Sequence, residues 1–274
     1  MRAERGAADG AALALFFAVL TALTVGAFLF HEWRPPVASQ HGKGVDTLIT
    51  YLLATTGLVF ILGHAVLAWF LWKNPGEGPS RYKPVRPRVE WLWALAPAFG
   101  MALIAEVGVF FLSKPVWAQV YGPPPADAVQ VEVVGKQFEW LVRYAGKDGK
   151  FGRTLPERVD DAENPLGLDK DDAAATDDIV LRGSLHLPAG RAVFVRLRSH
   201  DVLHSFSIPL FRVKQDVVPG MSISVRFTPE TPGTYEIACA ELCGLGHYKM
   251  RGFAYVKGPE EFQKWMDAQE GFLE

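Results

Sequence analysis

The chain has 274 residues, of which 49% are hydrophobic, and a formal net charge of −2 at pH 7. The length suits one or two domains, and the charge lacks the basic excess of a nucleic-acid-binding protein. Residues 1–124 hold 10 basic and 7 acidic residues (net +3), whereas residues 125–274 hold 18 and 23 (net −5).

Three long apolar runs lie at residues 11–30, 47–72 and 91–113. The first has no charged residue, the second has only His64 as a group that titrates near neutral pH, and the third has one acid, Glu106. A helix needs roughly 20 mainly apolar residues to cross a bilayer, so all three runs are predicted to be transmembrane helices. An ionisable group inside a span usually faces protein, but the pattern assigns no role to Glu106.

The first run could instead be a secretory signal, because it follows Arg2 and Arg5 and precedes the small-residue sequence VAS at 37–39. Signal cores are about 7–15 residues long, whereas this run has 20. We therefore favour a retained span, with cleavage as the alternative. Neither outcome changes the orientation of the other two spans.

The loop between the second and third runs predicts the orientation. It holds more basic than acidic residues, namely Lys73, Arg81, Lys83, Arg86 and Arg88 against Glu77 and Glu90. Short loops rich in Lys and Arg stay in the cytoplasm, so the chain after the third run is predicted to be exported. The expected domains are an N-terminal transmembrane segment with a short outer loop (1–44), a transmembrane hairpin (45–118) and an exported domain (119–274).

The exported part consists of short alternating apolar segments, which favour β-strands, separated by turn signals rich in Pro and Gly. This pattern predicts a β-sandwich or Greek-key barrel, followed by a short helix that starts at Pro259. The predicted strands are VQVEVV (129–134), FEWLVRY (138–144), DIVLRGSLHL (178–187), AVFVRLRS (192–199), SISVRFTP (222–229), GTYEIAC (233–239) and FAYVKG (253–258).

Residues 155–178 fit no strand and hold nine acids against two bases, Arg158 and Lys170. We expect this segment to be a solvated loop. Carboxylates also suit calcium, but their spacing here matches no reliable calcium pattern.

The segment CAELCGLGHYKM (239–250) contains the only two cysteines of the chain, together with His247 and Met250. A Cys239–Cys243 disulfide is one alternative in an exported domain, but it leaves the histidine and the methionine unexplained. Zinc is another, although it prefers four Cys or His ligands. Thiolate, imidazole and thioether groups on a β-scaffold favour copper.

Two thiolates this close could bridge two metal ions, and such a pair needs a second histidine from elsewhere. The segment RSHDVLHSFSIP (198–209) offers His204 at the start of an apolar strand. His200, next to Asp201 in the preceding turn, is interpreted as a surface residue.

The pattern C-x-E-x-C-x-x-x-H-x-x-M, preceded by DVLHSF, resembles the binuclear copper (CuA) motif of cytochrome c oxidase subunit II. The resemblance extends from the second span onward and implies a membrane-anchored all-β fold, with a two- or three-helix anchor and a cupredoxin-like domain. It implies that Cys239 and Cys243 bridge two copper ions, that His204 and His247 are terminal ligands, and that Met250 is a weak ligand. Glu241 would offer its backbone carbonyl to one copper and its side chain to a magnesium ion shared with subunit I.

The resemblance has implications at three further positions. VEWLWALAP (89–97) is similar to the start of the family's second helix, so Glu90 would lie near the mouth of a proton pathway; a simple helix-capping acid is the alternative. Trp140 in GKQFEWLVRY matches a family tryptophan, but Phe138 stands where the family has the tryptophan that receives electrons. Phe138 keeps an aromatic ring there without the indole nitrogen.

These features predict subunit II of a bacterial-type haem–copper oxidase in the cytoplasmic membrane, with its C-terminal domain on the outer side. The resemblance implies electron transfer from a c-type cytochrome to haem in subunit I, where oxygen is reduced and protons are pumped. Asp201 is the expected rim of the docking site for that cytochrome. One alternative is a CuA subunit of another reductase, such as a nitric oxide reductase. A second is a quinol-oxidising homologue, which would lack the copper ligands, and a third is a membrane-tethered copper carrier.

Overall fold

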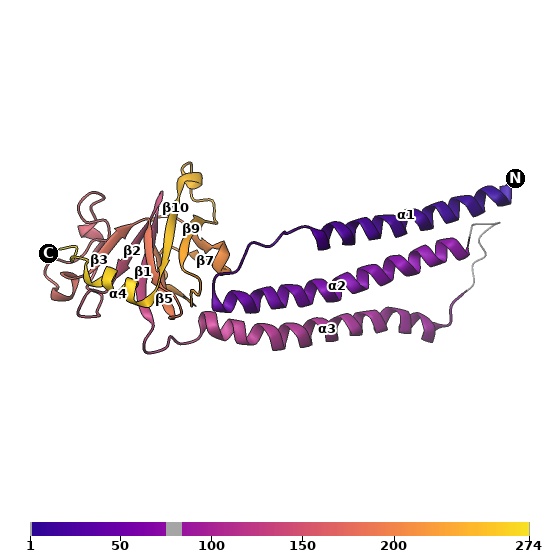
Figure 1. Cartoon of the computed structure of the whole chain (residues 1–274), viewed down its shortest axis with the longest axis horizontal. Coiled ribbons are helices and arrows are strands. Elements are labelled where there is room, and N and C mark those ends of the chain that lie inside the picture. The colour runs from indigo at the N-terminus through magenta and orange to yellow at the C-terminus, as the bar shows by residue number, and fades with distance from the viewer. Residues whose placement is uncertain (1, 75–83, 274) are drawn as a thin grey trace. The chain divides into compact units, whose positions relative to one another are not determined.

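A computed structural model of the chain describes residues 2–74 and 84–273 (Figure 1). The chain forms two compact units, one of Met1–Pro35 and Asp46–Ser113 and the other of Pro36–Val45 and Lys114–Glu274. Three loop residues used to predict the orientation, Glu77, Arg81 and Lys83, lie outside the described residues, as do the side chains of Arg2 and Arg5.

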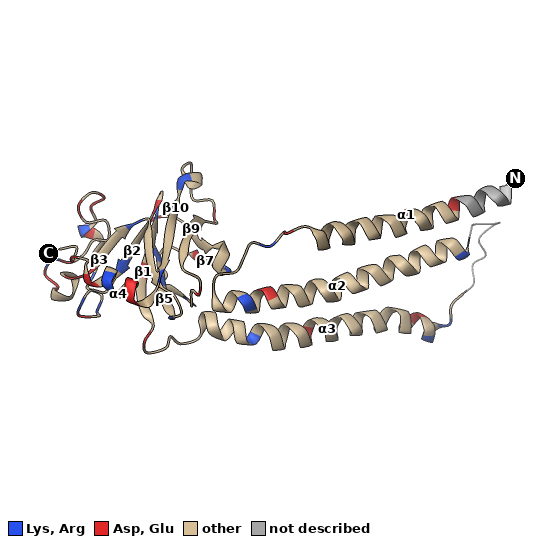
Figure 2. Cartoon of the chain, viewed as in Figure 1, with Lys and Arg blue, Asp and Glu red and all other residues tan. Residues whose placement is uncertain are grey.

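The described residues contain three long helices, α1 (Arg2–Phe30), α2 (Gln40–Lys73) and α3 (Pro87–Tyr121). Each contains a stretch long and apolar enough to span a membrane, which confirms the predicted helical anchor. Their charged residues lie mainly near the helix ends, and Glu106 of α3 is the exception (Figure 2). Tyr51 joins α2 to α3, because its Oη donates to the carbonyl of Ile104 at 2.6 Å and its ring lies against Gly108, which has no Cβ.

In the part of the second unit that the structure describes, there are ten strands. They are β1 (Val129–Lys136), β2 (Glu139–Tyr144), β3 (Ile179–Arg182), β4 (Ser184–Pro188), β5 (Val193–Ser199), β6 (His204–Ile208), β7 (Val213–Val217), β8 (Ile223–Phe227), β9 (Gly233–Cys239) and β10 (Arg251–Lys257), and the short helix α4 (Pro259–Asp267) follows them.

The strands form two five-stranded sheets, with orders β3-β2-β1-β5-β8 and β4-β10-β9-β6-β7. The pairs β1–β5 and β4–β10 are parallel, and the other pairs are antiparallel. Apolar side chains from both sheets, including Trp140, Leu185, Phe206 and Ile237, form a shared core. Burial between two such faces is the main stabilising contribution in a sandwich, and the predicted β-sandwich is confirmed.

The predicted strand at 178–187 is in fact two strands, β3 in one sheet and β4 in the other. Gly183 lies between them with φ of 65°, in the left-handed region that favours glycine. The chain therefore changes sheets at this residue. Strand β7 was not predicted, because three of its five residues are polar.

The acidic segment 155–178 contains none of the named strands, as predicted, but part of it is buried, so the expectation that the whole loop is solvated is wrong. Leu166 and Leu168 pack with Val134 and Leu141 in a small second core. The Asp169 carboxylate pairs with Arg153 and Arg158, and Asp178 pairs with the buried Arg143. Within residues 2–74 and 84–273, the one group of three or more side chains suited to a metal lies outside this segment.

The residues that precede α2 are held by the second unit. The N–H of Ala38 donates to the carbonyl of Leu210, and the N–H of Glu230 donates to the carbonyl of Ala38. Ser39 is fully buried, and its Oγ donates to the carbonyl of Phe211 at 2.7 Å. The VAS sequence thus lies against the folded β-domain.

Candidate metal centre

Three strand ends position the residues of the predicted site. His204 is the first residue of β6, Cys239 is the last residue of β9, and Met250 comes directly before β10. Because β9 lies between β10 and β6 in its sheet, these strand ends lie side by side at the same end of the sheet. Loop 240–250, which joins β9 to β10, adds Glu241, Cys243 and His247.

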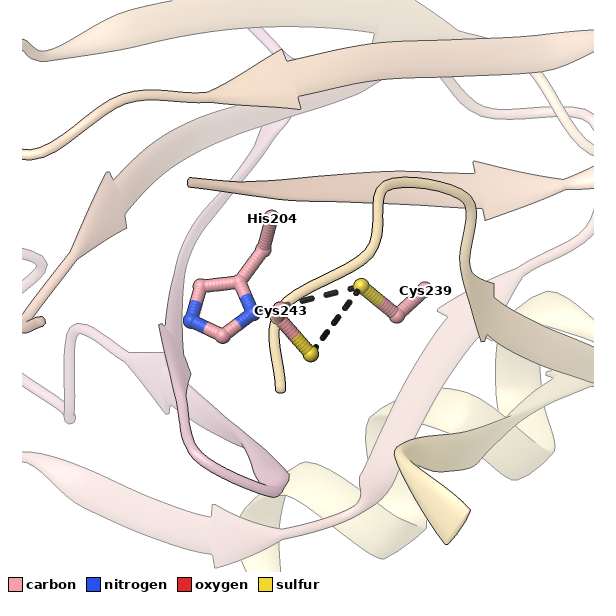
Figure 3. A group of neighbouring side chains, drawn as sticks. All are labelled: His204, Cys239 and Cys243. Carbon is pink, nitrogen blue, oxygen red and sulfur yellow. Dashed lines mark hydrogen bonds between the residues drawn. The ribbon is translucent and has the colours of Figure 1, made fainter. Parts of the chain in front are cut away.

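The two thiols form the middle of the site. The Sγ atoms of Cys239 and Cys243 are 3.9 Å apart, well beyond the roughly 2.05 Å of a disulfide bond, and both cysteines are free. The Nδ1 of His204 faces Cys239 at 3.9 Å from its Sγ (Figure 3). The donor atoms of these three residues all lie within 4.8 Å of one another.

The remaining predicted groups surround the same pair of sulfurs. The Nδ1 of His247 is 3.5 Å from the Sγ of Cys243, and the Sδ of Met250 is 3.7 Å from it. The carbonyl oxygen of Glu241 is 3.1 Å from the Sγ of Cys239. The structure therefore brings together all six predicted ligand groups, with one imidazole nitrogen beside each thiol.

His204 is held in its orientation from behind. Its Nε2 donates to the Asp201 carboxylate at 2.8 Å, and the N–H of Gln137 donates to the other oxygen of that carboxylate at 2.8 Å. Burial alone would raise the pKa of Asp201, but these hydrogen bonds hold it below its usual value. A Cβ at Gly135 would lie 2.9 Å from the His204 ring, so glycine is required there. His200 is exposed, as predicted.

The turn between β1 and β2 packs against the ligand loop. The side-chain amide of Gln137 donates to the carbonyl of Cys243, and the ring of Phe138 lies against Gly244 and Gly246. Sequence reasoning missed Gln137 and Gly135, because no spacing rule connects residues so distant along the chain. The only available signal was that Gln137 adjoins Phe138.

The two aromatic residues of the predicted electron route differ in exposure. Phe138 is 36% exposed, whereas Trp140 is fully buried. The Trp140 ring packs edge-on against His204, with centroids 6.0 Å apart, and against Phe206 at 5.6 Å. Trp140 therefore cannot touch a docked protein, and only Phe138 of the two reaches the surface.

Burial also affects the protonation of the Cys243 thiol. It raises the pKa of Cys243 to about 11, and the neighbouring Cys239 thiol adds to the effect. Without a metal this thiol is protonated at neutral pH, so a metal must displace its proton on binding. Cys243 and Met250 are 4% and 2% exposed, and His204 is fully buried, which keeps water away from half of the six ligand groups.

The side chain of Glu241 is not part of the cluster that its backbone carbonyl joins. The Glu241 carboxylate is 4.0 Å from the Nζ of Lys214. Glu90 is in the first turn of α3, where a carboxylate is favoured by the helix dipole.

The chain is similar to known proteins along most of its length. Residues 129–254 match the family profile described as cytochrome C oxidase subunit II, periplasmic domain. The "Alternative cytochrome c oxidase subunit 2" of Bradyrhizobium diazoefficiens is 38% identical over 262 residues, which cover 93% of this chain and 91% of the relative. The cytochrome c oxidase subunit 2 of Synechocystis sp. is 28% identical over 260 residues, with 87% and 76% covered.

Among solved structures, the periplasmic domain of subunit II of the cytochrome oxidase of Bradyrhizobium japonicum is 26% identical. It has a TM-score of 0.38 and covers 53% of this chain and 95% of that chain. The long match to the Bradyrhizobium diazoefficiens relative establishes the family by sequence. The chain therefore belongs to the cytochrome c oxidase subunit II family, and it is a subunit of a haem–copper oxidase.

Proposed function

We propose that this chain receives electrons at a binuclear copper (CuA) centre and delivers them to haem in the large subunit of the oxidase. The observation that carries the proposal is the pair of free thiols 3.9 Å apart, with an imidazole nitrogen beside each. His204, Cys239, Cys243, His247 and Met250 would hold the two coppers through their side chains, and Glu241 would do so through its carbonyl.

The chemistry of these donors fits copper better than zinc. Thiolates, imidazoles and a thioether are the soft and intermediate ligands that copper accepts, whereas a structural zinc site is completed by four Cys or His ligands. The buried Met250 thioether beside Cys243 supports this choice. The two thiol sulfurs and the four groups around them, six in all, are also more than one tetrahedral ion needs.

The protein supplies a rigid frame for this centre. When bound, the copper pair would supply a one-electron redox couple. Ligands on strand ends cannot relax far between redox states. Asp201 orients His204, Gln137 fixes the ligand loop, and the β1–β2 turn covers it.

The partners follow from this role. The donor would be a c-type cytochrome that docks near Phe138, and the acceptor would be haem of subunit I, where oxygen reduction and proton pumping take place. The exported domain would lie outside the bacterial cytoplasmic membrane, anchored by the α2–α3 hairpin and by α1 where it is retained. Glu90 would lie near a proton pathway of subunit I, and Glu241 would contribute to a magnesium site shared with it.

Electron paramagnetic resonance of the full chain, purified in detergent and loaded with copper, tests the proposal. We expect hyperfine splitting from two equivalent copper nuclei that share one unpaired electron. Splitting from a single copper would contradict it. The names of the relatives support an oxygen-reducing partner over a nitric oxide reductase, and the haem-bearing protein that co-purifies with the chain would distinguish the two.

A further inference from the structure

Glu106 is an acidic residue inside the membrane-spanning part of α3. Its side chain is exposed, and no described residue forms a hydrogen bond or an ion pair with it. The residues one turn before and after it on the same helix face are apolar and also exposed, among them Leu103, Val109 and Phe110. A carboxyl group thus lies within an otherwise apolar surface.

The position of Glu106 keeps it from water. Lys114, the next charged residue, is eight positions later, which corresponds to about 12 Å along the helix axis. In the other direction, Trp91 at the start of the apolar run is about 22 Å away. The short glutamate side chain cannot cover either distance, and an unpaired carboxyl group in hydrocarbon is costly.

The contact between α2 and α3 shows which way Glu106 faces. Tyr51 of α2 touches α3 at Ile104 and Gly108, which lie one turn apart on the same side of the helix. Glu106 comes two residues after Ile104 and two before Gly108, so it lies roughly 160–200° around the helix from both. It therefore faces away from α2, and its exposure shows that α1 leaves it uncovered.

We propose that Glu106 anchors this chain to a transmembrane helix of the haem-bearing large subunit that presents a basic or hydroxyl side chain to it. Leu103, Val109 and Phe110 would pack against the same helix. The choice of partner rests on the proposed function, because electron delivery to haem requires lasting contact with that subunit. A second copy of this chain fits poorly, since a symmetric pair would place carboxyl group against carboxyl group.

Co-purification tests the anchor. The oxidase is extracted through an affinity tag on this chain, and the haem recovered per tagged chain is measured in detergents of increasing stringency. We expect Glu106→Leu to lower the haem recovered per tagged chain at least about threefold, since interhelical hydrogen bonds in membranes have effects of this order. Glu106→Gln should retain most of the haem. Phe111→Leu, at an exposed position about 140° around the helix from Glu106, is the matched control and should behave as the wild type. Haem recovery with Glu106→Leu equal to wild type would overturn the proposal.

Crosslinking identifies the partner. A photoreactive phenylalanine analogue at position 110 should crosslink to the large subunit in membranes, whereas the same analogue at position 51, which faces α3, should not. Crosslinks only to lipid or to a second copy of this chain would overturn the proposal. The copper signal of each tagged chain is recorded in parallel, so failure of the copper assignment is distinguishable from failure of the anchor.

Discussion

The carboxylate of Asp201 and the imidazole of His204 form a hydrogen bond of 2.8 Å, from Nε2 of the ring to Oδ1 of the acid. With Nε2 bearing the proton, the lone pair of Nδ1 points towards the sulfur of Cys239. A carboxylate behind a ligand histidine fixes both the tautomer and the direction of the ring. Asp201, expected at the docking rim, is therefore better placed to position a ligand.

Replacing Asp201 with Ala should weaken copper binding, because His204 loses the group that fixes its ring. The expected loss of affinity is about 10- to 100-fold, measured by competition with a chelator. Asp201→Asn should have a smaller effect, since an amide oxygen still accepts a hydrogen bond. Asp127→Asn makes the same charge change at an exposed site and serves as the control. Equal copper affinities in all variants would mean that Asp201 does not position His204.

The cysteines and Met250 should differ in how strongly the copper pair depends on them. Cys239→Ser or Cys243→Ser should abolish the binuclear signal, because a hydroxyl is a hard and poorly bridging donor for copper. Met250→Leu should shift the reduction potential while copper stays bound. Copper content and electron paramagnetic resonance separate these outcomes. Loss of both metals from Met250→Leu would contradict its assignment as a weak ligand.

The ligand loop should exchange copper faster when the side chain of Gln137 is removed. That amide donates to the carbonyl of Cys243, and a hydrogen bond of this kind contributes about 1 kcal/mol, which corresponds to a factor of about five. We therefore expect copper release from Gln137→Ala to a chelator to speed up by about that factor, without a change in the number of coppers bound. A release rate equal to wild type would mean that the loop is rigid without this contact.

Electron acceptance should depend on the exposed ring of Phe138. Phe138→Ala should slow reduction of the copper centre by the cytochrome, whereas Phe138→Trp should be tolerated. The net charge of −5 on residues 125–274 favours a basic donor, and charges at the surface are screened beyond about 8 Å at physiological salt. Stopped-flow reduction across a salt series should therefore slow as salt rises. A reduction rate that depends neither on salt nor on the Phe138→Ala substitution would indicate a permanently bound donor.

Acid should destabilise the β-domain through His186. Its ring is stacked between Trp265 of α4, at 4.0 Å, and Tyr255, at 4.9 Å. Burial lowers the pKa of His186 from 6.5 to about 4, and Lys257 adds to the effect. The unfolded chain therefore takes up a proton between pH 6.5 and about 4 while the folded chain does not, so stability is complete above pH 6.5 and falls as the pH drops through this window.

Thermal unfolding at pH 7.5 and 4.5 measures this effect, which should be on the order of 1 kcal/mol after allowance for solvent screening. His186→Phe keeps a stacking ring and removes the titrating group. Its melting temperature should fall less with acid than that of the wild type. An identical fall in both proteins would assign the acid sensitivity to other groups.

Much of the site could be predicted from sequence because its ligands are close together along the chain. Cys239, Cys243, His247 and Met250 lie on one short loop, so their spacing alone indicated a metal site. The contacts of Gln137 and Asp201 join segments distant in sequence, and only the folded sandwich creates them. The change of sheet at Gly183 was likewise hidden, since the apolar alternation continues through it.

The buried segment at 37–39 has a consequence for biogenesis. Ala38 is 5% exposed and Ser39 is fully buried, and a protease needs an extended, accessible stretch of chain to cut. Once the β-domain has folded around these residues, the peptide bonds there are out of reach. If the first helix were removed at this sequence, the cut would therefore have to be made during export, before the β-domain has folded around these residues.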